Sequence, residues 1–240
     1  TGSTKVELGD NADVVNVRQI SGATSVFGNS GNDTFNVGAT DHTLRDIKAP
    51  LTVHGGVGTN VVNIDNSGAT SDAVDGTDPG AGSLTATQLS GLNMAGAVNY
   101  DGTAELNIYL GSGREFFTVR STHAGTTNIT KPAGNSNDAF LIQGVGGNTN
   151  ITTAGGNDRV TIQGVGAVLS GINGILNVVA QSDSTPDDLD HLIIDNSGAA
   201  VEQSGILSDT ELTGFGMSGS VVYAGFEDLT LTLGSAPDVL

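Results

Sequence analysis

The chain has 240 residues and a formal net charge of −18, from 26 acidic and 8 basic residues. Nucleic acids and anionic membrane surfaces are bound by clustered Lys and Arg, so this balance argues against both partners. No apolar run approaches the roughly 18 residues of a membrane span. Hydrophobic residues nevertheless make up 37% of the chain, which is more than a disordered acidic chain carries, so we predict a folded domain. Cysteine is absent, which leaves the redox compartment open.

Short apolar runs, each led by an acidic or Asn residue, recur along the sequence. Asp33, for example, precedes Phe35 and Val37, with the polar Asn36 between them. Apolar and polar residues that alternate with a period of two are typical of a half-buried strand. The residues that lead such runs are Asp13, Asp33, Asn60, Glu115, Asp138, Asp158, Asp190 and Asp238.

The spacing of these leading residues predicts a solenoid. Asp13 and Asp33 are 20 residues apart, as are Asp138 and Asp158, and a further apolar strand with a Gly-rich turn precedes several of them. About 20 residues fit one circuit of a parallel β-helix, whose successive circuits stack at the ~4.8 Å spacing of strands. We therefore predict an all-β, right-handed parallel β-helix (solenoid) of about nine or ten coils.

The sequence also contains a longer repeat, which includes several of the short ones. Residues 84–117 align with residues 207–240 without a gap, at an offset of 123, and the segment 65–69 recurs as 195–199. We interpret residues 1–240 as a single β-helix domain with a super-repeat 65–117 / 195–240, and expect insertions near residues 66–83 and 196–206. Both ends lack a capping element, so we expect the domain to be a fragment of a longer repeat array. The alternative is a natural subunit that stacks head to tail into a filament by strand addition.

Residues 100–119 and 223–240 resemble a segment found in very long secreted repeat proteins of bacteria. Residues 28–35 (GNSGNDTF) and 154–160 (AGGNDRV) resemble degenerate haemolysin-type calcium-binding repeats, whose unit is GGxGxD followed by alternating apolar residues. The resemblance implies a parallel β-helix in a secreted or cell-surface protein of the adhesin or surface-layer type. It also implies calcium sites, but haemolysin repeats follow one another in tandem and supply ligands from adjacent turns, whereas here they lie about 20 residues apart.

Four of the aspartates that lead apolar runs are the candidate metal ligands. Asp13, Asp33, Asp138 and Asp158 are expected at equivalent corners of the coils, where Ca²⁺ could bridge stacked carboxylates and turn carbonyls. The acidic cluster at 187–190 is a further candidate. The alternative is that each aspartate accepts hydrogen bonds from backbone N–H groups of the turns.

The most distinctive segments of the sequence are duplicated, whereas a catalytic site normally occurs once in a chain. The duplication therefore favours a scaffold. We predict a structural or adhesive extracellular repeat module, not an enzyme, without a resident cofactor, whose partners are copies or neighbouring repeats of the same protein. The alternative is a carbohydrate-active β-helix, either polysaccharide-binding or of the lyase or epimerase type. Outward Thr and Asn rows would offer a flat polar surface to carbohydrate; they are Thr127, Asn128 and Thr130, and Thr149, Asn150 and Thr152. Arg114, Arg120 and Arg159 could align on one face.

Overall fold

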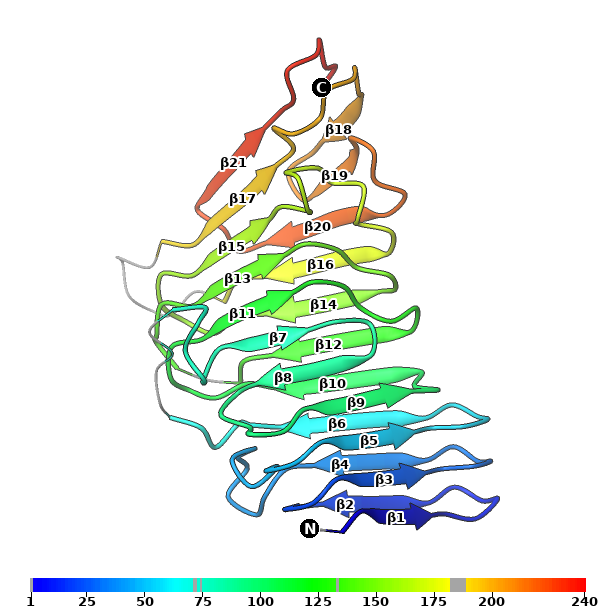
Figure 1. The fold of residues 1–240 in the computed structure, drawn as a ribbon. Helices are drawn as coiled ribbons and strands as arrows, with labels where there is room; N and C mark the ends of the chain where they lie inside the picture. The colour runs from blue at the N-terminus through cyan, green and yellow to red at the C-terminus, as the bar shows by residue number, and fades with distance from the viewer. Residues whose placement is uncertain (1, 71–72, 74, 133, 182–188) are drawn as a thin grey trace.

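The computed structural model describes residues 2–70, 73, 75–132, 134–181 and 189–240. These residues form two long sheets joined by turns, and no helix occurs among them. In the same part of the chain, therefore, no helix is long and apolar enough to cross a membrane. Figure 1 shows the strands stacked along one axis, and the arrows of one sheet point opposite to those of the other, except for β8 and β19, which are antiparallel within their own sheets.

Sheet A and sheet B alternate along the chain. Sheet A has eleven strands in the order β1 (Thr4–Glu7), β3 (Thr24–Phe27), β5 (Leu51–His54), β9 (Val98–Asp101), β8 (Gln88–Gly91), β7 (Gly82–Leu84), β11 (Phe116–Val119), β13 (Ala139–Ile142), β15 (Arg159–Ile162), β17 (His191–Asp195) and β21 (Asp228–Thr232). Sheet B has ten, in the order β18 (Gly205–Leu207), β19 (Glu211–Gly214), β20 (Ser220–Ala224), β16 (Ile175–Val179), β14 (Thr149–Thr152), β12 (Thr126–Thr130), β10 (Glu105–Tyr109), β6 (Val61–Asp65), β4 (Thr34–Val37) and β2 (Val14–Val17).

Successive coils pair in parallel, which confirms the predicted β-helix. The pairs β1–β2, β3–β4, β5–β6, β9–β10, β11–β12, β13–β14, β15–β16 and β17–β20 make eight circuits, and β21 begins a ninth. Parallel pairing keeps chemically similar residues in register, so that Val62 pairs with Phe35 on one side and with Leu106 on the other. All three side chains are fully buried. The core is thus a set of apolar rows that run along the axis between the two sheets.

Two antiparallel meanders interrupt the parallel order. In sheet A, β7 pairs antiparallel with β8 and β8 with β9; in sheet B, β18, β19 and β20 pair in the same way. Gly82 pairs with Gly91 in the first meander and Gly205 with Gly214 in the second, which reproduces the offset of 123. The insertions predicted near 66–83 and 196–206 coincide with the connections that follow β6 and β17. Each connection leads into an antiparallel hairpin, at 82–91 and at 205–214, and in the first of these Leu84 and Leu89 pack into the core.

The two halves of the molecule are the same structure displaced by half a circuit. Strands β6 and β10 belong to sheet B, whereas the strands at the equivalent positions of the second copy, β17 and β21, belong to sheet A. The structure also extends the repeat toward the N-terminus: the loop between β4 and β5 matches the loop between β15 and β16 at an offset of 125, with Ile20 bridged to Ile47 in one and Val145 to Ile172 in the other.

Candidate functional site

The candidate metal ligands lie in two rows on opposite edges of the solenoid. Asp13 and Asp33 lie at the first edge, in the turns that lead from sheet A to sheet B, whereas Asp138 and Asp158 lie at the second edge, in the turns from sheet B to sheet A. The expectation of one set of equivalent corners is therefore wrong in space, although Asp13 and Asp138 are equivalent in the duplication. The half-circuit displacement of the second copy is the cause. Asp187 and Asp188 fall outside the described residues.

Each row is a chain of hydrogen bonds from one coil to the next. At the first edge, Asp33 Oδ1 accepts from the backbone N–H of Asp13 at 2.9 Å, and Asn60 Oδ1 accepts from that of Asp33 at 2.9 Å. At the second edge, each side-chain carboxylate accepts from the backbone N–H of the leading residue one coil earlier. The four donor–acceptor pairs are Glu115 N to Asp138 (2.8 Å), Asp138 N to Asp158 (2.9 Å), Asp158 N to Asp190 (2.8 Å) and Asp190 N to Glu227 (2.7 Å). The leading residues thus cap turns of the neighbouring coil, which is the alternative role considered for them.

Geometry adds no support for a metal centre at these rows. Within the described ranges, no group of three or more His, Asp and Glu side chains is placed to hold a metal ion. Calcium binding by Asp13, Asp33, Asp138 and Asp158 stays a prediction that the hydrogen bonds neither require nor test.

A buried ion pair lies in the second-edge row. The Lys131 ammonium is 2.8 Å from the Asp138 carboxylate, and both side chains are fully buried. Nζ of Lys131 also donates to the carbonyl of Gly113 at 2.6 Å and to Oγ of Ser136 at 2.7 Å. Burial raises the pKa of the Asp138 carboxyl, and the hydrogen bond and charge of Lys131 act against that rise.

Among the residues that the structure describes, no Lys or Arg forms an ion pair with the next carboxyl in the row, that of Asp158. Burial raises the pKa of Asp158 to about 7, hydrogen bonds from the Thr153 side chain and the Asp138 backbone lower it, and the charges of Asp138 and Asp190 raise it further. The position that Lys131 occupies after β12 is occupied by Thr153 after β14. Asp158 therefore holds a proton more readily than an ordinary aspartate does.

An asparagine ladder runs along the outer face of sheet B. Each side-chain amide donates to the side-chain oxygen of the asparagine one coil back, in the steps Asn36 to Asn16 (3.0 Å), Asn63 to Asn36 (2.8 Å), Asn107 to Asn63 (2.9 Å), Asn128 to Asn107 (2.7 Å) and Asn150 to Asn128 (2.7 Å). The asparagines of the predicted outward rows, Asn128 and Asn150, thus lie on the outer face and are bonded along the axis. The prediction was wrong for Thr127 and Thr149, which are fully buried because they alternate with these asparagines along β12 and β14.

A hollow of about 490 Å³ opens on the outer face of sheet B, beside the asparagine ladder. We call it the β4 hollow; its lining is Asn16, Arg18, Asn36, Val37, Gly38, Ala39, Thr40, His42, Asn63, Asp65 and Tyr109. Arg18, Gly38, Asp65 and Tyr109 follow one another in register across four neighbouring strands. Gly38 lets the Asp65 backbone approach closely, since a Cβ at this position would lie 2.7 Å from the Asp65 carbonyl oxygen.

Two of the charged side chains in the β4 hollow, His42 and Asp65, pair with each other. His42 Nδ1 lies 2.6 Å from Asp65 Oδ2, and the hydrogen bond and charge of Asp65 raise the pKa of His42. Arg18 is exposed and forms no ion pair within the described part of the chain. The Tyr109 side chain is 38% exposed. His42 has a φ of 57°, a strained conformation for a non-glycine residue.

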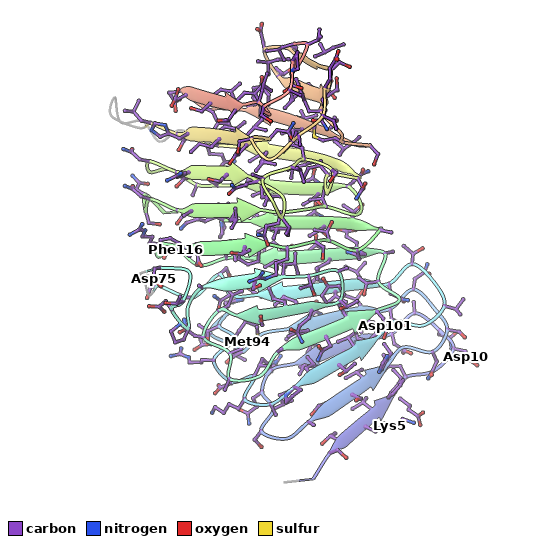
Figure 2. The ribbon with its side chains drawn as sticks, turned by 45° about the horizontal axis from the view of Figure 1, so that its top comes forward. Lys5, Asp10, Asp75, Met94, Asp101 and Phe116 are labelled. Carbon is purple, nitrogen blue, oxygen red and sulfur yellow. The ribbon has the colours of Figure 1, made fainter. Side chains whose placement is uncertain are left out.

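The three arginines predicted to align do not form a row. Arg159 lies on the outer face of sheet A, in register with Ala139 and His191. The Arg114 guanidinium stacks over the Phe116 ring at 4.7 Å, and Arg120 reaches Ser83 at the other end of β11. Figure 2 shows Phe116 on the outer face of sheet A, and Lys5 and Asp101 on the same face farther along the molecule.

Comparisons with known proteins give no family for this chain. No family model matches it, and no curated protein matches it. The sequence patterns do not mark the β4 hollow, because Arg18 and His42 come from different coils, after β2 and after β4. The signal that reveals it is the structural equivalence of the two halves, which needs the loop and strand registers to be known.

Proposed function

We propose that this chain is a structural repeat module that extends a secreted or cell-surface assembly by stacking end to end. The observation that carries the proposal is that polar ladders run along the axis of the solenoid at both edges and over the outer face of sheet B. Side-chain hydrogen bonds between coils add to the backbone pairing of the sheets and oppose separation of one coil from the next. Such a molecule suits a role as a stiff spacer that presents its faces.

The ends of the solenoid supply the stacking surfaces. Strands β1 and β2 are outermost at one end, and β21 and β18 at the other, where Val239 also pairs with residues 203–205 beside the start of β18. An outermost strand carries unpaired backbone N–H and C=O groups on one side, which can pair with another strand of the same kind. A head-to-tail contact of this type repeats without closing, so it produces filaments. The partner is a further repeat unit of the same kind, in the same protein or in a second copy.

Sedimentation velocity over a range of concentrations tests this proposal. The wild type should shift to larger, elongated species as concentration rises. Val14→Lys in β2 and Ile206→Lys in β18 place charges at the outermost strands through side chains that are 67% and 70% exposed, and both should weaken association. Val165→Lys, at a loop residue that is 82% exposed, is the matched control and should associate like the wild type. A wild type that stays monomeric throughout would contradict the proposal.

A further inference from the structure

The frame of the β4 hollow is built twice in this molecule. Leu44 N donates to Asn66 Oδ1 at 3.2 Å in the first copy, and Leu169 N donates to Asn196 Oδ1 at 3.1 Å in the second. Gly68 N donates to the carbonyl of His42, and Gly198 N to that of Ala167, at 2.8 Å in both cases. The two loop residues have nearly the same φ, 57° at His42 and 56° at Ala167.

The side chains on this frame differ between the copies. The positions of Arg18, Gly38, His42 and Tyr109 are occupied in the second copy by Gln143, Gln163, Ala167 and Thr232. Asp65 and Asp195 are kept, but their partners change: Asp65 contacts His42, whereas Asp195 accepts from Gln163 Nε2 at 2.7 Å. The second copy shows that the frame folds without an arginine, a histidine or a tyrosine. The first-copy residues are therefore free to serve a ligand.

The hollow has the size and chemistry of a site for a short chain of sugars. Arg18 and Tyr109 lie three strand steps apart, which is about 14 Å at the strand spacing, and the volume is in the usual range for small-ligand sites. An exposed tyrosine ring packs against an apolar ring face. An unpaired guanidinium binds a carboxylate in a bidentate manner. The amides of Asn36 and Asn63 and the carboxylate of Asp65 can bind hydroxyl groups between these two ends.

We propose that the β4 hollow binds a short acidic oligosaccharide of the uronate type, with one sugar ring on Tyr109 and a carboxylate on Arg18. The oligosaccharide crosses the strands of sheet B and follows the asparagine ladder. The charge of the whole chain is −18, but charges beyond about 8 Å are largely screened at physiological salt, so the local guanidinium decides the preference for an anion. The inference goes beyond the structural role, and its failure would leave the stacking proposal standing.

Isothermal titration calorimetry with two matched probes tests the proposal. A galacturonate trimer should bind the wild type at physiological salt, and a galactose trimer should bind at least about tenfold more weakly, since it lacks the carboxylate. Arg18→Gln should weaken binding of the galacturonate trimer at least about tenfold and remove the preference between the probes. Tyr109→Thr should weaken binding of both probes by a similar factor, because it removes the ring platform.

The control variants use the second copy. Arg18→Gln and Tyr109→Thr each introduce the residue that the second copy carries on the same frame, so the thermal midpoint should stay at the wild-type value. Gln143→Ala and Thr232→Ala, at the equivalent positions of the second copy, should leave binding unchanged. Absence of galacturonate binding, equal binding of the two probes, or wild-type affinity in Arg18→Gln would each overturn the proposal.

Discussion

At the scale of single residues, the second-edge row concentrates buried charge at one side of the core. Five acidic side chains follow one another there, and of these Asp138 pairs with the buried Lys131. Taking a carboxylate and an ammonium out of water is costly, and their attraction offsets that cost only when both are present. The row is therefore the place where one substitution should have the largest effect on stability.

Replacement of Lys131 by methionine should destabilise the fold by about 3–5 kcal/mol, because it leaves the Asp138 charge buried and unpaired. Urea denaturation followed by circular dichroism measures the change. Lys48→Met is the matched control, since Lys48 pairs with Asp46 at the surface and should leave the midpoint nearly unchanged. The double variant Lys131→Met/Asp138→Asn should recover much of the loss. A single variant as stable as the control would contradict the role of this pair.

Asp158 should make stability depend on pH. Its pKa is about 7 in the folded chain and about 3.9 in an unfolded one, so the folded state binds a proton more tightly. The free energy of unfolding should then fall as pH rises from about 4 to about 7, by up to about 1.4 kcal/mol per pH unit, and level off above. Asp158→Asn stays neutral and should lose this contribution.

The measurement is the difference in unfolding free energy between Asp158→Asn and the wild type at pH 5 and at pH 8. The variant should gain on the wild type as pH rises, and a difference that does not change with pH would show that the carboxyl is already ionised at pH 5. An asparagine is compatible with such a row: Asn60 accepts from Asp33 N and donates to the carbonyl of Gly102 at 3.0 Å.

At the scale of elements, the asparagine ladder ties the strands of sheet B together. Asn107 donates to Asn63 and accepts from Asn128, so Asn107→Ala removes two rungs and should cost about 1–3 kcal/mol at about 1 kcal/mol each. Asn177 is in register with Asn150 but has no such rung among the described residues, so Asn177→Ala is the control. Equal losses in the two variants, measured by urea denaturation, would show that the rungs contribute nothing to stability.

Much of this element structure was predictable from the sequence, and the reasons differ between elements. The strands led by Asp33 and Asp158 alternate apolar and polar residues, and this local pattern decides which face is buried. Which sheet a strand joins depends instead on the number of half circuits before it. The meander of β7, β8 and β9 belongs to the first half and has its counterpart in β18, β19 and β20, and the alternation of apolar residues carries no sign that the second copy changes sheets.

The β4 hollow could not be predicted from the sequence, for the same reason. Arg18 and Tyr109 are 91 residues apart in the chain, and their proximity follows from the register of β2, β4, β6 and β10. The contact of His42 with Asp65 depends on a loop conformation with positive φ. Alternation of apolar residues reports burial but says nothing about such contacts on an outer face.

At the scale of the whole molecule, each coil contacts the coils before and after it, so the solenoid behaves as a one-dimensional stack. In a stack of this kind, the same pairing that joins two coils inside the chain can join two chains at their ends. In Figure 1, β1 and β2 lie at one end of the stack, and β21 and β18 at the other, where residues 203–205 also pair with Val239. The proposed end-to-end growth would extend this internal pairing from one chain to the next.

Electron cryo-microscopy of the concentrated protein tests this central claim most directly. The account predicts filaments one solenoid wide, with strands perpendicular to the filament axis and a repeat of about 4.8 Å continuous across the junction between copies. Discrete single particles at every concentration, or copies joined through the outer faces of sheets A and B, would contradict it.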